Sequence, residues 1–292
     1  MPELPEVETI ARGLAQNLTG DVIESVWLGN KPEPLKSPPG EIVSTLEQAR
    51  IAGVRRVGKH IVVDLSREPG AARHKKKQVL RSAQDDKRQR ERHAQTQWIV
   101  HLGMTGQLLI AKPENELPKH THAILRLRSG RELRFVDPRR FGRLAVVRRG
   151  FQAPGSEPLN VGVELFAGLF RKRQTPIKSA LLNQKLLSGI GNIYADESLF
   201  RANVRPRRRA TSLTRAELQR LHGAVQKVLN EAIAAGGSSV SDYVDSNGDA
   251  GFFQFQHRVY GREGEPCLVC RTPVKRIVIA GRSAHYCPKC QR

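Results

Sequence analysis

The chain has 292 residues, and its 49 Lys and Arg against 28 Asp and Glu give a formal net charge of +21 at pH 7. A hydrophobic content of 39% excludes a wholly disordered basic protein, because it provides enough apolar surface for a core. No uninterrupted apolar run approaches the roughly 18 residues of a membrane span. We therefore expect a soluble protein, and its length favours two domains over one.

The excess of positive charge indicates a polyanionic partner. Charge alone leaves three interpretations open, namely nucleic acid, an anionic membrane face or a solubilising surface. The N-terminal sequence MPELPEVETIARG carries three carboxylates where a secretory signal carries positive charge, so we expect no export. All four cysteines lie in the last 26 residues as two C-x-x-C pairs, which is typical of a metal site in a reducing compartment. A cytoplasmic location follows.

Residues 5–20 are predicted to form an amphipathic helix. Apolar residues recur at helical spacing, Pro5 suits the first turn and Gly20 suits the end. From about 22 to 147 short β-type runs follow, with a Ser-Gly turn between two of them, so we expect an all-β region closed by this one helix. The runs are VIESVWL, IVVDL, QWIVHLGM, HAILRLRSGRELRFVD and GRLAVV.

Residues 67–97 interrupt this pattern. They carry ten Lys and Arg and four Asp and Glu, with almost no apolar periodicity. We interpret them as a solvated loop insertion, and we expect it to be poorly ordered and dispensable. The insertion supplies +6 of the net charge, so the rest of the chain is strongly basic without it.

After a Pro- and Gly-rich linker at 151–162, the period becomes helical. Helices are predicted near 176–187 and from 193 to 201, on either side of the turn SGIGN. A third begins at Thr214, where Glu217 completes a capping box, and runs to Gly236 and Gly237. The second domain is thus predicted to be helical, and it leads through a Gly-, Ser- and Asp-rich loop into the cysteine segment.

The two cysteine pairs have the spacing of a zinc ribbon. Two thiolate pairs separated by a hairpin can close a tetrahedral Zn²⁺ site, which we expect to be structural because no coordination position stays open. The expected ligands are Cys267, Cys270, Cys287 and Cys290. Between the pairs, VKRIVI and AHYC are predicted strands, which would place Gly281 and Arg282 at a hairpin tip. Arg282 could be a solvated turn residue or a finger that contacts a phosphate backbone.

The N-terminus offers a second candidate for chemistry. Removal of Met1 before a small residue would leave Pro2 with a free secondary amine, and only an unprotonated amine attacks a carbonyl-like carbon. An α-amino group, with a pKa of about 7.7 to 8.0, is far more often neutral at pH 7 than a lysine with a pKa of about 10.4. Proline is more basic than that, and Glu3 would raise its pKa further, so this advantage requires local desolvation or positive charge.

Taken together, these motifs resemble the bacterial formamidopyrimidine-DNA glycosylases. The resemblance covers nearly the whole chain outside 67–97. It rests on PELPEVET, HLGMTG, KHTH, DPRRFG, GIGNIYADESLF, VYGREGEPC and the terminal cysteines. It implies an α+β fold with an N-terminal catalytic β-sandwich with flanking helices (1–150), the linker (151–162), a helix-two-turn-helix DNA-binding domain (163–256) and a zinc-ribbon finger (257–292).

The resemblance also implies a bifunctional enzyme, which excises oxidised purines such as 8-oxoguanine and formamidopyrimidines and then cleaves the abasic strand by β,δ-elimination. By position, Pro2 is similar to the family's Schiff-base nucleophile and Glu3 to its proton donor. Lys59 matches the lysine that assists β-elimination, and Arg282 matches the arginine of δ-elimination. Without the resemblance, Lys59 would be interpreted as a surface strand lysine.

The remaining matches concern DNA binding. His120, Arg139 and Arg173 fall on the family's DNA-binding positions, and Asn192 falls in the turn of the helix-two-turn-helix motif, where backbone N–H groups suit a phosphate. Met104 and Phe141, together with Arg139, resemble the wedge that fills the gap left by a flipped nucleotide. For His101, contact with a phosphate and a buried structural role are equal alternatives.

The expected partner is therefore double-stranded DNA containing oxidised purines, bound by a monomer with one structural Zn²⁺ and no membrane association. Two alternatives remain. An endonuclease VIII-like enzyme for oxidised pyrimidines usually begins PEGPE, and Leu4 argues against it. In a non-catalytic zinc-ribbon DNA-binding protein, Pro2 and Glu3 would be incidental.

Overall fold

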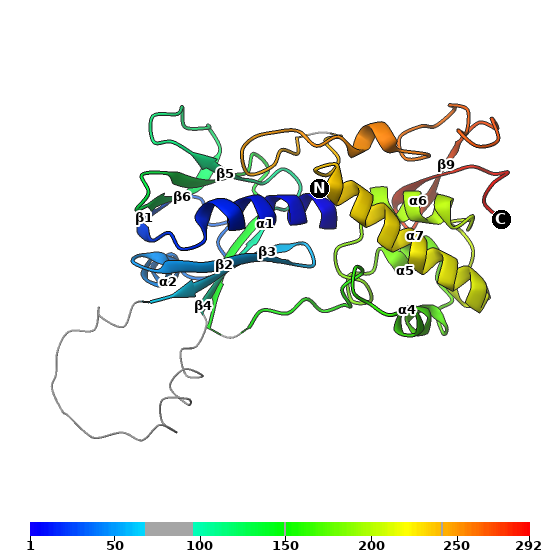
Figure 1. Ribbon diagram of the computed structural model, residues 1–292, viewed down its shortest axis with the longest axis horizontal. Helices are drawn as coiled ribbons and strands as arrows, with labels where there is room; N and C mark the ends of the chain where they lie inside the picture. The colour runs from blue at the N-terminus through cyan, green and yellow to red at the C-terminus, as the bar shows by residue number, and fades with distance from the viewer. Residues whose placement is uncertain (68–95, 149, 241) are drawn as a thin grey trace, which may run out of the picture.

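The computed structural model describes residues 1–67, 96–148, 150–240 and 242–292 (Figure 1). A lobe of β-sheets and a lobe of helices lie side by side, with the last strands beside the helices (Figure 1). This arrangement confirms the predicted α+β fold. The basic insertion expected at 67–97 lies outside the described residues except at its ends, where Thr96 begins a strand and Arg67 follows one.

Helix α1 (Leu4–Leu18) connects the two lobes. Pro5 occupies its first turn, and its apolar face is buried along its whole length. Val7, Ile10 and Leu14 pack in the core of the sheet lobe, whereas Leu4 packs in the core of the helical lobe. The residues ahead of Leu4 are therefore held at the junction of the two lobes.

The sheet lobe is a sandwich of two four-stranded antiparallel sheets with the orders β1-β6-β7-β5 and β2-β3-β4-β8. Apolar side chains from both sheets and from α1 form one core. The first sheet consists of β1 (Ile23–Leu28), β6 (Thr121–Leu127), β7 (Glu132–Val136) and β5 (Gln107–Ala111). The second consists of β2 (Arg50–Val57), β3 (His60–Ser66), β4 (Thr96–His101) and β8 (Arg143–Val147).

The prediction of an all-β region between 22 and 147 was wrong at one element and incomplete at two others. Helix α2 (Pro39–Leu46) lies inside it, and strands β2 and β5 were not predicted. Strand β2 carries Gly53 at a register shift, and only Ile51 in it is buried, so it lacks a clear alternation. The predicted Ser-Gly turn is present, with Gly130 at a φ of 80° between β6 and β7.

The helical lobe packs around a second core. Its helices are α4 (Val163–Phe170), α5 (Ile177–Leu181), α6 (Asn192–Arg201) and α7 (Arg215–Ala234), with 3₁₀ turns η1 (Ala210–Ser212) and η2 (Phe253–Gln256). Helix α5 is shorter than the predicted 176–187, and α4 was not predicted. The predicted capping box is present, because the Thr214 hydroxyl accepts the Glu217 N–H at 3.2 Å and Glu217 accepts the Thr214 N–H at 2.8 Å.

The chain ends in a hairpin of β9 (Lys275–Ile279) and β10 (Arg282–Tyr286), beside a small core that contains Phe200, Val259 and Val274. Ala280 and Gly281 have φ values of 47° and 75° and form the tip, so Arg282 is the first residue of β10. In the described parts of the chain, no helix combines the length and the hydropathy needed to cross a lipid bilayer.

Candidate active site

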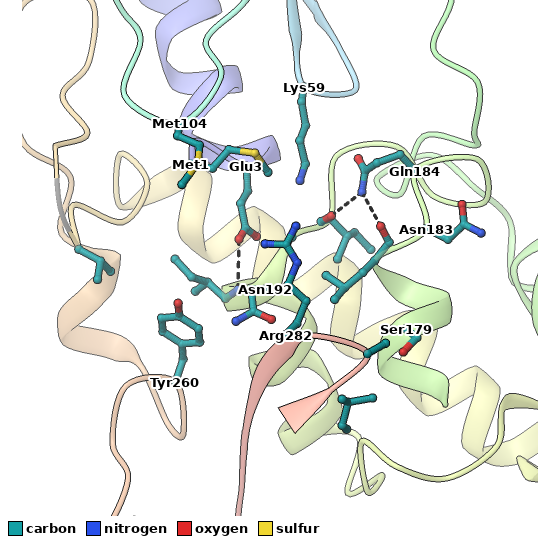
Figure 2. Close-up of a pocket in the computed structure, with 17 residues that line it drawn as sticks. Met1, Glu3, Lys59, Met104, Ser179, Asn183, Gln184, Asn192, Tyr260 and Arg282 are labelled. Carbon is teal, nitrogen blue, oxygen red and sulfur yellow. Dashed lines mark hydrogen bonds between the residues drawn. The ribbon is translucent and has the colours of Figure 1, made fainter. Parts of the chain in front are cut away.

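Glu3 lies where α1 begins and faces the start of α6. Its side chain is only 4% exposed, and Oε1 accepts the Ile193 N–H at 3.2 Å (Figure 2). This approach requires a glycine at position 191, because a Cβ there would lie 2.2 Å from Glu3 Cδ. Glu3 Oε2 is buried and has no hydrogen-bond partner among the described residues. One carboxylate oxygen is thus anchored, and the other is available to a ligand.

Burial raises the pKa of Glu3 to about 7, although the positive charge of Lys59 opposes this shift. At neutral pH the carboxyl group is therefore protonated in a large fraction of molecules. A carboxylic acid of this kind can donate a proton in a reaction and take it back.

Lys59 enters the site from the sheet lobe, at the turn between β2 and β3. Gly58, with a φ of 61°, turns the hairpin against Ser188, whose Cβ would lie 3.1 Å from an added Cβ. The Lys59 side chain is only 8% exposed and points toward Arg282 and Glu3 (Figure 2). Burial lowers its pKa, whereas the carboxylates of Glu3 and Glu6 raise it. More of this amine is neutral than of a surface lysine.

Glu3, Lys59 and Arg282 line a cavity of about 510 Å³ between the lobes (Figure 2). Arg282 reaches it from the start of β10, so three distant parts of the chain meet in one space. Met104, Asn192 and Tyr260 also line it. The cavity has the size of a site for a single small ligand or nucleotide.

Met1 also lines this cavity, beside Met104 (Figure 2). It is about half exposed, whereas Pro2 is buried and lines a smaller adjoining space with Glu6. In the described chain the Pro2 nitrogen is part of a peptide bond with Met1. Removal of Met1 would convert that nitrogen into an amine at the edge of the cavity.

Glu6 supports this corner and was not predicted from the sequence. Its carboxylate accepts the Glu3 N–H at 2.7 Å, the Ser238 N–H at 2.9 Å and the Tyr194 hydroxyl. These three donors come from the start of α1, from the loop after α7 and from α6. Glu6 thereby holds the backbone of Glu3 in place. The only indication in the sequence was a second carboxylate three residues after the first, as in a capping box.

The candidate wedge residues lie on two adjacent loops. Met104 and Phe141 are 41% and 53% exposed, and the Arg139 guanidinium carbon lies 4.8 Å from the centroid of the Phe141 ring. The buried carboxylate of Asp137 holds both loops, through the Thr105 hydroxyl at 2.6 Å and the Gly142 N–H at 2.7 Å. Asp137 was not predicted as a site residue, because its partners are visible only in the fold.

His101 lies at the end of β4, half-buried beside His60. Burial, with the nearby charges of His60 and Arg143, lowers its pKa to about 4, so the ring is neutral at pH 7. Its Nδ1 accepts the Gly103 N–H at 3.1 Å. These features favour the structural alternative, in which His101 supports the Met104 loop.

The other expected DNA-binding residues lie apart from the cavity, except Asn192. His120 is exposed before β6 and lines a separate cavity with Arg140. Arg173 is exposed after α4, and its Nε donates to the Leu169 carbonyl oxygen at 2.9 Å. Asn192 lies at the first position of α6, and its Nδ2 donates to Ser283 Oγ at 3.1 Å.

Buried charged residues attach the β9–β10 hairpin to the helical lobe. Lys178 donates to Asp196 Oδ1 at 2.6 Å and also to the Ser283 carbonyl oxygen, and both side chains are almost fully buried. Asp196 Oδ2 in turn accepts the His285 N–H at 2.9 Å. Because Ser283 follows Arg282, this network sets where Arg282 enters the cavity.

The four cysteines form one cluster, as predicted. Tetrahedral zinc with Zn–S bonds of about 2.3 Å requires sulfur atoms roughly 3.8 Å apart. The sulfur atoms of Cys267 and Cys290 are 3.9 Å apart, those of Cys270 and Cys287 are 3.4 Å apart, and all four lie within 4.8 Å of one another. The cluster fits one Zn²⁺ ion and leaves no ligand position for a substrate, so the metal is structural.

Comparison with known proteins gives matches along nearly the whole chain. The formamidopyrimidine-DNA glycosylase N-terminal domain matches residues 1–144, the H2TH domain of the same enzymes matches 153–244, and a zinc finger found in FPG and IleRS matches 264–292. A formamidopyrimidine-DNA glycosylase of Solibacter usitatus is 41% identical over 295 residues, which cover 100% of both chains.

Two solved structures are similar to this chain over nearly its whole length. The crystal structure of the MutM (Fpg) protein of Thermus thermophilus is 39% identical, with a TM-score of 0.80, and the match covers 99% of this chain and 98% of that one. A complex of a Lactococcus lactis Fpg mutant with DNA containing Fapy-dG is 28% identical, with a TM-score of 0.83 and full coverage of both chains.

Proposed function

Because the chain belongs to the formamidopyrimidine-DNA glycosylase family, we propose that it excises oxidised purines from duplex DNA and then cleaves the abasic strand by β,δ-elimination. The observation that carries this proposal is the meeting of Glu3, Lys59 and Arg282 in one cavity next to the Pro2 nitrogen. The net charge of +21 suits a DNA partner. We also propose that the enzyme acts as a monomer in the cytoplasm.

The first step requires a nucleophile and an acid at the same sugar. The Pro2 amine, free after removal of Met1, attacks C1′ of the damaged nucleotide, and the glycosidic bond breaks with its electron pair leaving on the base. Glu3 protonates the ring oxygen, which opens the sugar to a Schiff base on Pro2. The pKa of about 7 lets Glu3 hold this proton at neutral pH.

The strand is then cut by two eliminations. Removal of a proton from C2′ expels the 3′ phosphate, and removal of a proton from C4′ expels the 5′ phosphate. Lys59 has a pKa lowered by burial and assists the first elimination as a base. Arg282 is positioned by Lys178 and Asn192 through Ser283 and assists the second by binding the departing phosphate.

Base flipping requires unstacking, which costs a few kcal/mol. Met104, Arg139 and Phe141 offset this cost by filling the vacated space, and they are exposed on loops that Asp137 holds together. His120, Arg173 and Asn192 contact the phosphate backbone in this proposal. Zn²⁺ maintains the fold of the finger that carries Arg282 and takes no part in the chemistry.

The test is borohydride trapping on a duplex with one 8-oxoguanine·cytosine pair. A chain that begins at Pro2 is expected to form a covalent adduct at residue 2, and a chain with one additional residue upstream is expected to bind the duplex without forming it. An adduct from the extended chain would contradict the assignment to Pro2. Faster trapping on thymine glycol than on 8-oxoguanine would favour the endonuclease VIII-like alternative, and binding without any adduct would favour the non-catalytic one.

A further inference from the structure

A second cavity, of about 660 Å³, lies in the sheet lobe and shares no lining residue with the cavity at Glu3. Its walls come from the end of β1, from the segment that leads into β6 and from the turn after β7. His120, which we expect to contact DNA, is part of the second wall. The cavity is therefore continuous with the proposed DNA-binding surface.

Trp27 gives this cavity an aromatic wall. Its side chain is 48% exposed on β1, and the chain's other tryptophan, Trp98, is only 1% exposed. Gly29 leaves the indole uncovered at this point, because a Cβ there would lie 3.5 Å from the ring. A large exposed aromatic face beside a cavity is suited to stacking with a planar ligand.

The cavity is also positively charged. Lys31 and Lys119 both line it, both are exposed, and neither forms an ion pair within the described parts of the chain. Arg140 lines it as well, but it is paired with Glu33 at 2.9 Å. The two ammonium groups suit a phosphate, and the indole between the same walls suits a base, so one cavity can hold both parts of a nucleotide.

We propose that this cavity binds one unpaired nucleotide of the DNA that flanks the lesion, with its base stacked on Trp27 and its phosphate held by Lys31 and Lys119. This inference rests on the proposed function, because it assumes that DNA lies against His120. The base is unpaired because a duplex covers both faces of each base, and because a concave cavity admits a single nucleotide. Aromatic stacking and a cationic groove are the usual elements of single-strand binding.

The consequence is a preference for certain substrates. A lesion whose flanking DNA is unpaired at the right distance, as at a strand end or a junction, is bound more tightly than the same lesion in a continuous duplex. Stacking of one base contributes enough to raise the affinity roughly fivefold or more. The preference does not depend on the base sequence of the overhang, because every base has a face that can stack.

The experiment uses 8-oxoguanine duplexes whose single-stranded overhang begins at successive one-nucleotide steps from the lesion, on either side, with a blunt duplex for comparison. Tryptophan emission is recorded during titration. Because Trp98 is buried, a change on stacking reports Trp27. We expect quenching and tighter binding at one overhang position on one side of the lesion, and neither with the blunt duplex.

Trp27→Ala is expected to remove the extra affinity for that overhang, by roughly fivefold or more, and to leave excision from the blunt duplex unchanged. Lys31→Ala and Lys119→Ala should weaken overhang binding, whereas Lys112→Ala, an exposed lysine of the same lobe outside the cavity, should weaken it less. Equal affinity of the wild type and Trp27→Ala for every overhang, or emission that no overhang quenches, overturns the proposal. Excision from the blunt duplex tests the proposed function separately, because overhang quenching can be measured whether or not the base is removed.

Discussion

The Asp137 carboxylate accepts a hydrogen bond from the Thr105 hydroxyl at 2.6 Å. It also accepts the Gly142 N–H at 2.7 Å, and its side chain is fully buried. Thr105 follows Met104, and Gly142 follows Phe141, so one carboxylate joins the two loops that carry the proposed wedge. The loops touch directly as well, because a Cβ on Gly103 would lie 2.5 Å from the Phe141 carbonyl carbon.

This arrangement predicts the effect of Asp137→Asn. The amide keeps the shape of the carboxylate, but its NH₂ group is a donor where Asp137 has an acceptor oxygen. That NH₂ group would face a backbone N–H group, and leaving such buried donors unpaired costs about 1 to 3 kcal/mol. We expect 8-oxoguanine excision to fall more than cleavage of a preformed abasic site, because an abasic nucleotide is easier to extrude. Asp64→Asn removes a charged partner of Arg55 and Gln97 in the same lobe and serves as the control. Equal losses in the two assays would contradict the role in the wedge.

The pKa of Glu3 predicts how both activity and stability depend on pH. Its pKa is raised by burial from 4.5 to about 7, so the folded chain binds this proton more tightly than the unfolded chain. Its contribution to stability is therefore fully present below pH 4.5 and is lost as the pH rises through about 7. Base excision should decline as the pH rises through about 7, because the protonated form of Glu3 disappears there.

Glu3→Gln separates these two effects. It mimics the protonated acid, so we expect its free energy of unfolding to exceed that of the wild type by roughly 3 kcal/mol at pH 8 and to approach it near pH 4.5. Excision should be lost at every pH. Denaturant unfolding at several pH values measures the first quantity, and single-turnover excision measures the second. A variant with the wild-type dependence of stability on pH would rule out the raised pKa.

Much of the site could be predicted from the sequence because its principal residues lie in contiguous motifs. Glu3, Lys59 and the four cysteines were candidates because each stands within a recognisable pattern. The structure places Glu3 and Lys59 at one cavity and the four cysteines in one cluster. Glu6 and Asp137 were missed because their roles depend on partners that the fold alone brings near, such as Ser238, which lies 232 residues from Glu6. Among the elements, β2 was missed because its apolar residues do not alternate, and α5 was predicted too long because buried apolar residues continue after the helix ends.

Gly191 is predicted to be necessary for function more than for folding. A Cβ at this position would lie 2.2 Å from Glu3 Cδ, so Gly191→Ala should push the carboxylate away from the start of α6. The φ of Gly191 is −129°, which alanine adopts freely, so backbone strain is not expected. We expect excision to fall at least a hundredfold, as a displacement of about 1 Å can cause, while the melting temperature changes little.

The control for that variant is Gly168→Ala in α4, where no atom of the described residues lies within 4 Å of an added Cβ. It should stabilise the chain by about 0.5 to 1 kcal/mol, since alanine favours the helix, and leave excision unchanged. Activity near that of the wild type in Gly191→Ala would show that Glu3 need not contact α6.

Lys178 is predicted to govern the second elimination, although it does not line the cavity. Its ammonium group holds Asp196 and the Ser283 carbonyl oxygen, and Ser283 adjoins Arg282. Lys178→Met would leave the buried Asp196 charge without its cation, which costs roughly 3 to 5 kcal/mol of stability, and would release the start of β10. We expect products of β-elimination to accumulate over those of δ-elimination, because Arg282 would no longer be held at the departing phosphate.

The ratio of the two cleavage products, resolved on a denaturing gel, distinguishes this role from general destabilisation, which would lower both products together. Arg208→Met removes an ion pair with Glu217 in the same lobe and should leave the ratio unchanged. Lys178→Arg keeps the positive charge, so it should restore the ratio in part. If Lys178→Met lowered the total cleavage but kept the wild-type ratio, the buried network would have a structural role only, and the position of Arg282 would depend on the zinc ribbon alone.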